Sequence, residues 1–409
     1  MITVKPFAAL RPKHAYAKEC AALPYDVMSS DEAREEVVGK PYSFLHVDKA
    51  EIDLEKGVDL YDDKVYAKAA ENLKRLETDG IYETESKKGF YFYRLIMNGR
   101  AQTGIVACAS IDDYIENRIK KHELTRADKE ADRIRHVDTC SAQTGPIFLT
   151  YRDNAVLDEI IARETEKAPL YDFISDDGIR HTVWIGEAER EIEEAFQKEK
   201  SLYIADGHHR AASAVKAGLK RRGENPDYDG TEEFNFFLSV IFPAKSLKIM
   251  DYNRLLYDIG GMDESTFLQA VENALGKVTP VENVYAPQTR HTVGLCLRGK
   301  WYAVQFKEEI CQNPSPAKRL DCAILQNAFL APVLGINDPR TDKRIDFVGG
   351  IRGLAYLQTR CKADAKAAFS MFPTSLEELM EIADADEIMP PKSTWFEPKL
   401  RSGLLIHKI

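Results

Sequence analysis

One stretch of the chain combines an apolar run, a glycine and four ionisable side chains, and this combination can hold an anion. Residues 202–205 are apolar, Asp206-Gly-His-His-Arg210 follows, and small residues then begin a helical pattern. A strand, a glycine-containing turn and a helix N-terminus leave backbone N–H groups and the positive end of the helix dipole free to face a ligand. Arg210 adds a planar, charged fork that suits a phosphate or a carboxylate. We therefore expect Gly207 and Arg210 to bind the anionic part of a substrate.

The same stretch contains groups that can transfer protons. Carboxylates and histidines are the side chains that most often act as general acids and bases, and histidine titrates close to neutral pH. The sequence therefore predicts catalytic roles for Asp206, His208 and His209. The alternative is an ordinary capped turn, in which Asp206 caps the helix and both histidines face solvent.

A second group of ionisable residues occupies the charged segment between residues 114 and 136. At helical spacing, four of its basic residues would share one face, with Glu123 beside them. These four are His122, Lys129, Arg133 and His136. Such a face could bind a phosphate through Lys121, His122 and Arg133 while the Glu123 carboxylate abstracts a proton or holds a metal ion. The alternative is a solvated helix with exposed ion pairs, each contributing at most about 1 kcal/mol.

Two irregular segments near the C-terminus are rich in groups that bind anions. Asp338-Pro-Arg-Thr-Asp-Lys-Arg344 precedes a Gly-Gly pair, and it either closes over a ligand or is a plain solvent loop. The tail, residues 389–403, contains Lys392 and Arg401. An irregular terminal segment would normally fray, so we expect this one to fold back and close over the site, with Lys392 and Arg401 reaching the ligand. The alternative is a tail that packs only on its own domain.

The histidines do not follow a metal-ligand pattern, because His208 and His209 are adjacent and face different directions. A zinc or iron site is therefore not expected. Mg²⁺ fits better, since its usual ligands are carboxylates and substrate phosphates, and Asp206 or Glu123 would supply the protein ligand. The sequence has no Walker A loop, no Gly-x-Gly-x-x-Gly fingerprint and no Gly-x-Ser-x-Gly elbow, which disfavours the common nucleotide-binding and hydrolase folds.

The composition is that of a globular protein with more than one domain. Its 409 residues exceed what one compact core usually contains, so two or three domains are expected. The net charge of −10 argues against binding of nucleic acid or of an anionic membrane, and it leaves an oligomer possible. Seven cysteines without a Cys-x-x-Cys pair, no signal peptide and no apolar run of about 20 residues predict a cytoplasmic protein with reduced thiols.

Strands and helices alternate along the chain without a long block of strands, which predicts a mixed α/β (α+β) fold. Helical periodicity is clear over residues 61–79, and Asn98-Gly99 predicts a hairpin between strands 89–97 and 102–110. The other prominent elements are expected as helices at 155–166, 187–199, 264–275 and 315–334 and as strands at 147–151, 181–185, 235–243, 292–297 and 301–306. Arg254 ends a strand-like run and is a further candidate binder of phosphate or carboxylate.

Six short motifs together resemble a bacterial and archaeal family described only as domain of unknown function 1015. They are Pro6-Phe-Ala-Ala-Leu-Arg-Pro12, Pro24-Tyr-Asp-Val27, Lys121-His-Glu-Leu-Thr125, Asp206-Gly-His-His-Arg210, Asp251-Tyr-Asn-Arg254 and Met389-Pro-Pro-Lys-Ser-Thr-Trp-Phe396. The likeness extends over essentially the whole chain.

A more distant resemblance concerns Asp206-Gly-His-His-Arg210 and the small residues after it. This stretch is similar to the phosphate-binding box of the ParB/sulfiredoxin superfamily, in which free-serine kinases carry a similar Asp-Gly-His-x-Arg sequence. The resemblance implies a ParB/sulfiredoxin-like core. Because the box lies much later here than in the compact kinases, the implied core at residues 1–255 contains an inserted α/β segment at about 50–200. A C-terminal α/β region with the closing tail would occupy residues 256–409.

The residues and the resemblance together lead to phosphoryl transfer on a small hydroxylated amino acid. The resemblance implies L-serine and O-phospho-L-serine as the small molecules, in a serine kinase-like reaction with a nucleotide or pyrophosphate as the phosphoryl donor. Such a transfer requires mostly positioning and charge neutralisation, which Arg210, backbone N–H groups and Mg²⁺ would supply. Two alternatives stay open: a phosphoserine phosphatase that uses the same site, and a non-catalytic switch that binds a nucleotide or phosphate ligand.

Overall fold

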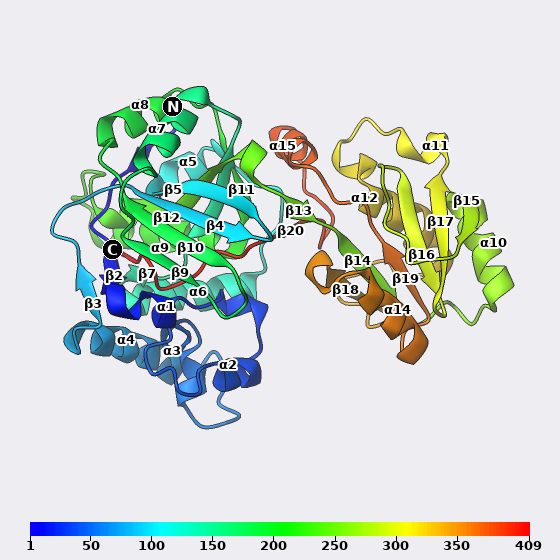
Figure 1. The fold of residues 1–409 in the computed structure, drawn as a ribbon, viewed down its shortest axis with the longest axis horizontal. Helices are drawn as coiled ribbons and strands as arrows, with labels where there is room; N and C mark the ends of the chain where they lie inside the picture. The colour runs from blue at the N-terminus through cyan, green and yellow to red at the C-terminus, as the bar shows by residue number, and fades with distance from the viewer. The chain divides into compact units, whose positions relative to one another are not determined.

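The computed structural model describes residues 1–409 and divides into two compact units (Figure 1). The first unit comprises residues 1–247 and 398–409, and the second comprises residues 248–397, which are thus inserted in the sequence of the first. Both units combine helices with sheets, so the predicted mixed α/β fold class is confirmed. The organisation implied by the resemblance, a core to residue 255 with an insertion at about 50–200, stays a prediction.

A nine-stranded mixed sheet forms the centre of the first unit. Eight strands follow one another in the order β6-β11-β8-β12-β5-β4-β10-β9, and β1 pairs with β5. Their bounds are β1 Val4–Lys5, β4 Tyr91–Met97, β5 Arg100–Ser110, β6 Ile119–Lys120, β8 Ile147–Tyr151, β9 Tyr171–Ile174, β10 Arg180–Ile185, β11 Leu202–Asp206 and β12 Phe236–Pro243. β12 lies between parallel β8 and antiparallel β5, and it is buried along its whole length.

The hairpin between β4 and β5 confirms the prediction made from Asn98-Gly99. Both residues have positive φ, 51° for Asn98 and 78° for Gly99, as a tight two-residue hairpin turn requires. Both strands of the hairpin are long. β5 pairs with β12 and β4 pairs with β10, so the hairpin forms the middle of the sheet.

Helices of the first unit bury their apolar residues against this sheet and against a second core near the N-terminus. The helices are α1 Ala17–Cys20, α2 Ser30–Glu36, α3 Leu45–Asp48, α4 Asp63–Thr78, α5 Ile111–Ile115, α6 Ala127–Cys140, α7 Ala155–Glu164, α8 Glu189–Gln197 and α9 His208–Glu224. α7, α8 and α9 share one core with the large sheet, whereas α3 and α4 pack in the second core. Two short pairs complete the unit: β2 Leu10–Pro12 with β3 Tyr82–Thr84, and β7 Ala142–Gln143 with β21 His407–Lys408.

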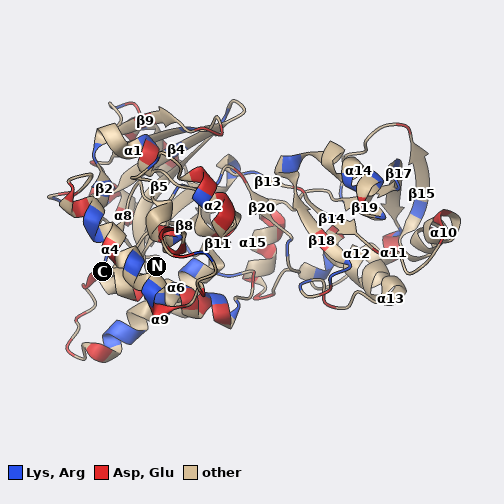
Figure 2. Ribbon diagram, turned by 90° about the horizontal axis from the view of Figure 1, so that it is seen from below, with Lys and Arg blue, Asp and Glu red and all other residues tan.

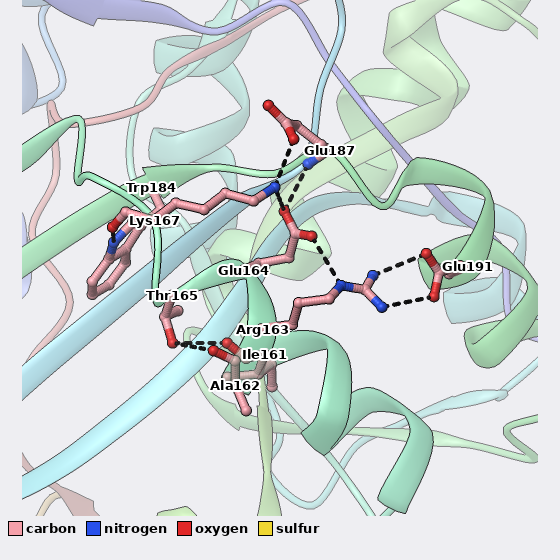
Figure 3. A network of polar contacts seen from close by, with 9 residues as sticks. All are labelled: Ile161, Ala162, Arg163, Glu164, Thr165, Lys167, Trp184, Glu187 and Glu191. Atoms are coloured by element: carbon pink, nitrogen blue, oxygen red, sulfur yellow. Dashed lines mark hydrogen bonds and ion pairs between the residues drawn. The ribbon is translucent and has the colours of Figure 1, made fainter.

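A polar network joins α7 to α8 and to the segment between them (Figure 3). The buried Glu164 carboxylate accepts hydrogen bonds from Lys167 Nζ at 2.7 Å and from the Glu187 backbone N–H at 2.9 Å. Arg163 forms a fork with the Glu191 carboxylate, at 2.9 and 3.2 Å. Glu164 is buried, whereas Arg163 and Glu191 are exposed. The hydrogen bonds of Glu164 therefore stabilise the packing of α7 and α8 more than the Arg163–Glu191 pair does.

Acidic and basic side chains are interspersed along α6, whereas the charged side chains of α9 are basic except for Glu224 at its end (Figure 2). Ion pairs connect these two helices: Lys216 binds Glu130, and both Lys220 and Arg221 bind Asp138. These ion pairs involve the C-terminal half of α9, whereas the N-terminus of the helix is part of the site described below.

The second unit is built on a six-stranded sheet in the order β15-β17-β16-β19-β14-β18, in which every pair is antiparallel. The strands are β14 Tyr252–Leu256, β15 Gly276–Val281, β16 Thr292–Leu297, β17 Lys300–Phe306, β18 Ile345–Gly349 and β19 Ala367–Ser370. The helices are α10 Glu264–Ala274, α11 Glu308–Cys311, α12 Asp321–Leu325, α13 Ala331–Leu334, α14 Leu354–Ala363 and α15 Leu376–Asp384. A further pair, β13 Ile249–Met250 with β20 Trp395–Phe396, joins the two ends of the unit.

The helix predicted at 315–334 is present only over residues 321–334, and it is not a regular α-helix throughout. The segment consists of a 3₁₀ turn at Ala317–Arg319, α12, a π-helical turn at Gln326–Leu330 and α13. Pro332 explains the π turn, because it has no N–H for the carbonyl four residues earlier and its ring crowds that carbonyl. The preceding turn therefore widens to a longer hydrogen-bond spacing.

Candidate active site

Asp206-Gly-His-His-Arg210 lies where β11 ends and α9 begins, so the predicted strand, glycine turn and helix are all present. Gly207 is the residue before the helix and has φ 92° and ψ 34°, a conformation that L side chains rarely adopt. A Cβ at this position would lie 3.0 Å from both Nε and Nη2 of Arg210. The absence of a side chain thus allows the Arg210 guanidinium to fold back over the start of α9.

The Arg210 guanidinium is only partly satisfied. Nη1 donates to the Pro146 carbonyl, Nη2 lies 4.0 Å from Asp206 Oδ2, and the buried Nε has no hydrogen-bond partner. No side chain caps the N-terminus of α9. Unpaired buried donors are costly, and here they adjoin the positive end of a 17-residue helix. This arrangement favours binding of an oxyanion.

Asp206 is held as a carboxylate. Its Oδ1 accepts the Gly207 N–H at 2.8 Å, and its Oδ2 accepts a hydrogen bond from Lys399 Nζ at 3.1 Å. Burial opposes ionisation, but the charges of Lys399 and Arg210 lower the pKa of Asp206 below its ordinary value. Asp206 does not cap α9, so the capped-turn alternative does not describe this junction.

His122 and His208 form a buried pair beside Asp206. Their ring centroids are 4.4 Å apart with the planes at 82°, and the His122 backbone N–H points at His208 Nε2 at 3.5 Å. Burial lowers the pKa of His122 to about 4 and that of His208 well below the ordinary value. Both ring nitrogens of His122 lack partners. The pair is therefore neutral at physiological pH and available for hydrogen bonds to a ligand.

Glu123 and His209 complete the junction. The Glu123 carboxylate is half-exposed, and its Oε2 lies 3.7 Å from His208 Nδ1. His209 Nε2 accepts the Arg126 backbone N–H at 3.0 Å. Burial lowers the pKa of His209, against the opposing charges of Asp26 and Glu130. Asp206, Glu123, His122, His208, His209 and Arg210 are thus brought together as neighbours.

The single helical face predicted for the charged segment is wrong for His122, because α6 begins only at Ala127, whereas Lys129, Arg133 and His136 do lie on this helix at helical spacing. Residues 121–126 instead cross the start of α9, where backbone N–H groups of His122 and Arg126 meet the rings of His208 and His209. These contacts replace the hydrogen bonds that an earlier helix start would make. Lys121, a predicted phosphate binder, lies with Nζ 4.4 Å from the centre of the Tyr114 ring.

A small cavity of about 30 Å³ adjoins Arg210 and has room for water molecules. It contains charged groups of both signs. Its lining includes Tyr25, Asp48, Arg133, His136, Thr144, Arg210, Ser213 and Ser402. Asp48 is buried and accepts a hydrogen bond from Thr144 Oγ1 at 2.6 Å. Arg133 stacks 4.1 Å from the Tyr25 ring centre and binds Asp132 at 2.9 Å.

The residues of the cavity and junction that were not assigned a site role from the sequence include three ionisable ones: Tyr25, Asp48 and Lys399. Tyr25 lies in the Pro24-Tyr-Asp-Val27 motif and Lys399 lies in the donor-rich tail, so a signal existed for both. Asp48 belongs to no motif. It reaches the cavity only through the packing of α3, which local sequence does not reveal.

Three other predicted binding residues lie elsewhere. Arg401 is buried in the first unit and is bound to Asp177, with Ser175 Oγ at 3.3 Å from its Nη2. Arg254 and Lys392 belong to the second unit, where Lys392 Nζ lies 5.7 Å from the Tyr252 ring centre. The tail is therefore divided: residues 398–409 belong to the first unit, and residues 389–397 belong to the second.

No cluster of three or more His, Cys, Asp or Glu side chains that could bind a metal ion occurs in the structure. None of its helices has the length and apolar character needed to span a membrane.

The model of the family described as "Protein of unknown function (DUF1015)" matches residues 4–323. No curated protein matches the chain. Among solved structures, similarity extends to a free serine kinase in complex with AMP (TM-score 0.35, 15% identity, 72% of this chain and 91% of that chain). It also extends to C-terminally truncated SbnI from Staphylococcus aureus (0.39, 9%, 72% and 85%). A conserved hypothetical protein from Pyrococcus furiosus is similar as well (0.36, 17%, 73% and 94%).

Proposed function

The chain belongs to the DUF1015 family, and we propose that its β11–α9 junction transfers a phosphoryl group to or from a small hydroxylated amino acid, L-serine or O-phospho-L-serine. The observation that carries the proposal is the Arg210 guanidinium, whose buried Nε lacks a partner beside an uncapped helix N-terminus. The oxygens of a phosphoryl group would accept hydrogen bonds both from the Arg210 guanidinium and from the backbone N–H groups at the start of α9.

The groups near the cavity support an amino acid as the acceptor. Asp48 is buried and negatively charged when ionised, which suits the substrate ammonium, whereas Arg133 would bind its carboxylate in exchange for Asp132, its partner in this structure. The cavity of about 30 Å³ is smaller than such a substrate, so binding requires the lining side chains to move apart. Arg210 lines this cavity and also approaches Asp206, and it would therefore bind the phosphoryl group between acceptor and donor.

Glu123 is the better candidate for the base that accepts the hydroxyl proton. Asp206 is engaged by Lys399 and by the Gly207 N–H, and its lowered pKa makes it a weak base. Glu123 is half-exposed and lies 3.7 Å from His208. In the kinase direction the hydroxyl oxygen attacks the terminal phosphorus of the donor, the bond to the leaving phosphate group breaks, and the proton passes to Glu123.

The carboxylates at the junction are compatible with Mg²⁺ brought by the donor. Protein sites for this ion often provide only one or two carboxylates, because substrate phosphates and water complete the octahedron. Asp206 or Glu123 would hold the ion, and its contribution would be to neutralise charge on the donor phosphates. A nucleotide or pyrophosphate is the donor that we propose.

Replacing the proposed base tests the assignment. Glu123→Gln should lower turnover of serine with donor by at least about 100-fold while the fold and phosphoserine binding are retained. Glu224→Gln, at an exposed carboxylate in the last turn of α9, is the matched control and should leave turnover unchanged. Near-wild-type turnover in Glu123→Gln, measured beside Asp206→Asn, would move the base to another residue.

A further inference from the structure

The second unit contains a pocket of about 340 Å³, which lies within the size range of small-molecule sites. Its lining combines one buried arginine, amide side chains and an apolar wall. The residues are Arg254, Cys322, Ala323, Gln326, Asn327, Leu330, Asn337, Asp338, Pro339, Arg340, Ile345, Phe347, Pro390 and Pro391. All belong to residues 248–397, so the pocket is a property of this unit alone.

Arg254 is the feature that gives this pocket a preferred ligand. Its side chain is buried, with the residue 4% exposed, and its only hydrogen bond to a protein oxygen is from Nη1 to the Tyr252 carbonyl. No carboxylate lies within ion-pair distance of it. Burial lowers the pKa of the guanidinium, which shows that the surroundings disfavour the charge. A buried charge without a counter-ion is costly, and an anionic ligand would remove that cost.

The other charged residues of the lining neutralise one another. Arg340 binds the Asp338 carboxylate through Nε and Nη2, both at 2.9 Å, and both side chains are largely exposed. The negative charge of Asp338 is therefore already balanced at the pocket rim. Arg254 remains the one unbalanced charge in the lining.

Backbone packing fixes Arg254 in this position. Arg254 pairs with Phe347 across β14 and β18, and the Phe347 ring centre is 5.4 Å from Cζ of Arg254. The Gly350 N–H donates to the Asp251 carbonyl at 2.7 Å, and a Cβ at Gly350 would lie 2.2 Å from Asp251 Oδ1. The glycine therefore allows a close approach of the chain just before the start of β14, three residues ahead of Arg254.

A π-helical turn forms the facing wall. Gln326–Leu330 contributes Gln326, Asn327 and Leu330 to the pocket, and the Gln326 side chain donates to the Ile336 carbonyl at 2.7 Å. Turns of this kind are rare and are frequently found at functional sites. The bond from Gln326 also fixes the start of the loop that supplies Asn337 to Arg340.

We propose that this Arg254 pocket binds a small organic anion, with a phosphate or carboxylate oxygen on the Arg254 guanidinium. The amide groups of Gln326, Asn327 and Asn337 would bind the polar part of the ligand, and Pro390, Pro391 and Phe347 would contact its apolar part. Three segments that the β11–α9 junction does not use meet here. They are Asp251-Tyr-Asn-Arg254, the loop at 338–344 and Met389-Pro-Pro-Lys-Ser-Thr-Trp-Phe396.

Equilibrium binding to the full-length protein tests this proposal. Inorganic phosphate and acetate are titrated separately, so that the two arms distinguish a phosphate site from a carboxylate site. Four proteins are compared: wild type, Arg254→Met, Arg210→Ala and the double variant. We expect wild type to bind one more equivalent of phosphate or of acetate than Arg254→Met does, and Arg210→Ala to retain that equivalent.

The controls separate a lost site from a lost fold. Arg340→Gln changes a lining arginine that is already paired with Asp338, and this variant should still bind the additional equivalent of anion. Asn327→Trp leaves Arg254 in place and fills the pocket from its exposed wall. It should raise the dissociation constant of the additional anion at least tenfold. Equal anion stoichiometry in wild type, Arg254→Met and Asn327→Trp would overturn the proposal, as would no binding of either anion to wild type. Because Arg210 is varied independently, failure of this pocket leaves the proposed function of the junction untouched.

Discussion

At the scale of single residues, Arg210 is the side chain on which the proposed chemistry depends. It is 12% exposed, folds over Gly207 and has an unpaired Nε, so its removal deletes a partly buried, charge-assisted contact. Arg210→Ala should weaken binding of phosphoserine by roughly 2–4 kcal/mol in calorimetric titration. The fold should survive, because the side chain does not fill a hydrophobic core. Unchanged affinity in a folded variant would contradict the anion site.

His122 supplies a prediction about pH. Its pKa is about 4 in the folded protein, against about 6.5 for a solvated histidine in the unfolded chain, so between these values the unfolded chain binds more protons. The contribution of His122 to stability is therefore complete above about pH 6.5 and is lost as the pH falls towards 4. His122→Leu removes this dependence and two unpaired ring nitrogens.

Denaturant unfolding at several pH values measures the effect. The free energy of unfolding of His122→Leu relative to wild type should rise by about 2 kcal/mol between pH 8 and pH 5. His14→Gln, at an exposed histidine, is the control and should keep the wild-type pH dependence. A constant difference between His122→Leu and wild type across this range would show that His122 is not held neutral by burial.

At the scale of elements, the junction between β11 and α9 requires a glycine at position 207. Gly207→Ala introduces a Cβ at φ 92° and 3.0 Å from the Arg210 guanidinium. We expect a loss of about 1–2 kcal/mol in the free energy of unfolding, together with weaker phosphoserine binding because Arg210 is displaced.

Gly223 in the same helix provides the matched comparison for Gly207. A Cβ at Gly223 has nothing within 4 Å, so Gly223→Ala should stabilise the protein by about 0.5–1 kcal/mol and leave binding unchanged. Melting curves and titrations on both variants check the pair. Equal behaviour of the two alanine variants would mean that the backbone at Gly207 is not essential to the site.

Local signals in the sequence predicted many elements and missed long-range placements. The strand at 147–151 has the predicted bounds, and Asn98-Gly99 gave the hairpin, because periodicity and turn chemistry are local properties. The helix predicted at 315–334 begins only at Asp321, because Leu320 is extended, and Pro332 widens the preceding turn to a π turn without ending the helix. Residues 121–126 failed as a helix because their partners are the histidines of a helix about 85 residues later.

The candidate site shows the same limit. Asp206, His208, His209 and Arg210 are consecutive or nearly so, and their grouping follows from one motif. Asp48 and Lys399 are far from them in sequence, and only the tertiary structure shows that they approach Arg210 or Asp206.

At the scale of the whole molecule, the second unit has paired ends. Ile249 of β13 is opposite Phe396 of β20, so residues 248–397 begin and end at the same place. We expect this fragment to fold alone, because chain ends already held together need no support from the flanking sequence. A cooperative melting transition and a folded circular dichroism spectrum of the isolated fragment would confirm the prediction, and a disordered spectrum would contradict it.

The most direct test of the central claim is ³¹P NMR of the full-length protein with L-serine and, in turn, ATP, ADP or pyrophosphate in the presence of Mg²⁺. The account predicts a phosphoserine resonance with at least one donor, lost in Arg210→Ala and strongly reduced in Glu123→Gln. Phosphoserine alone, followed in the same way, separates hydrolysis from transfer. Binding of phosphoserine without turnover in either direction would instead indicate a ligand switch. Failure both to form phosphoserine with any donor and to consume it would contradict the assignment of phosphoryl transfer to this site.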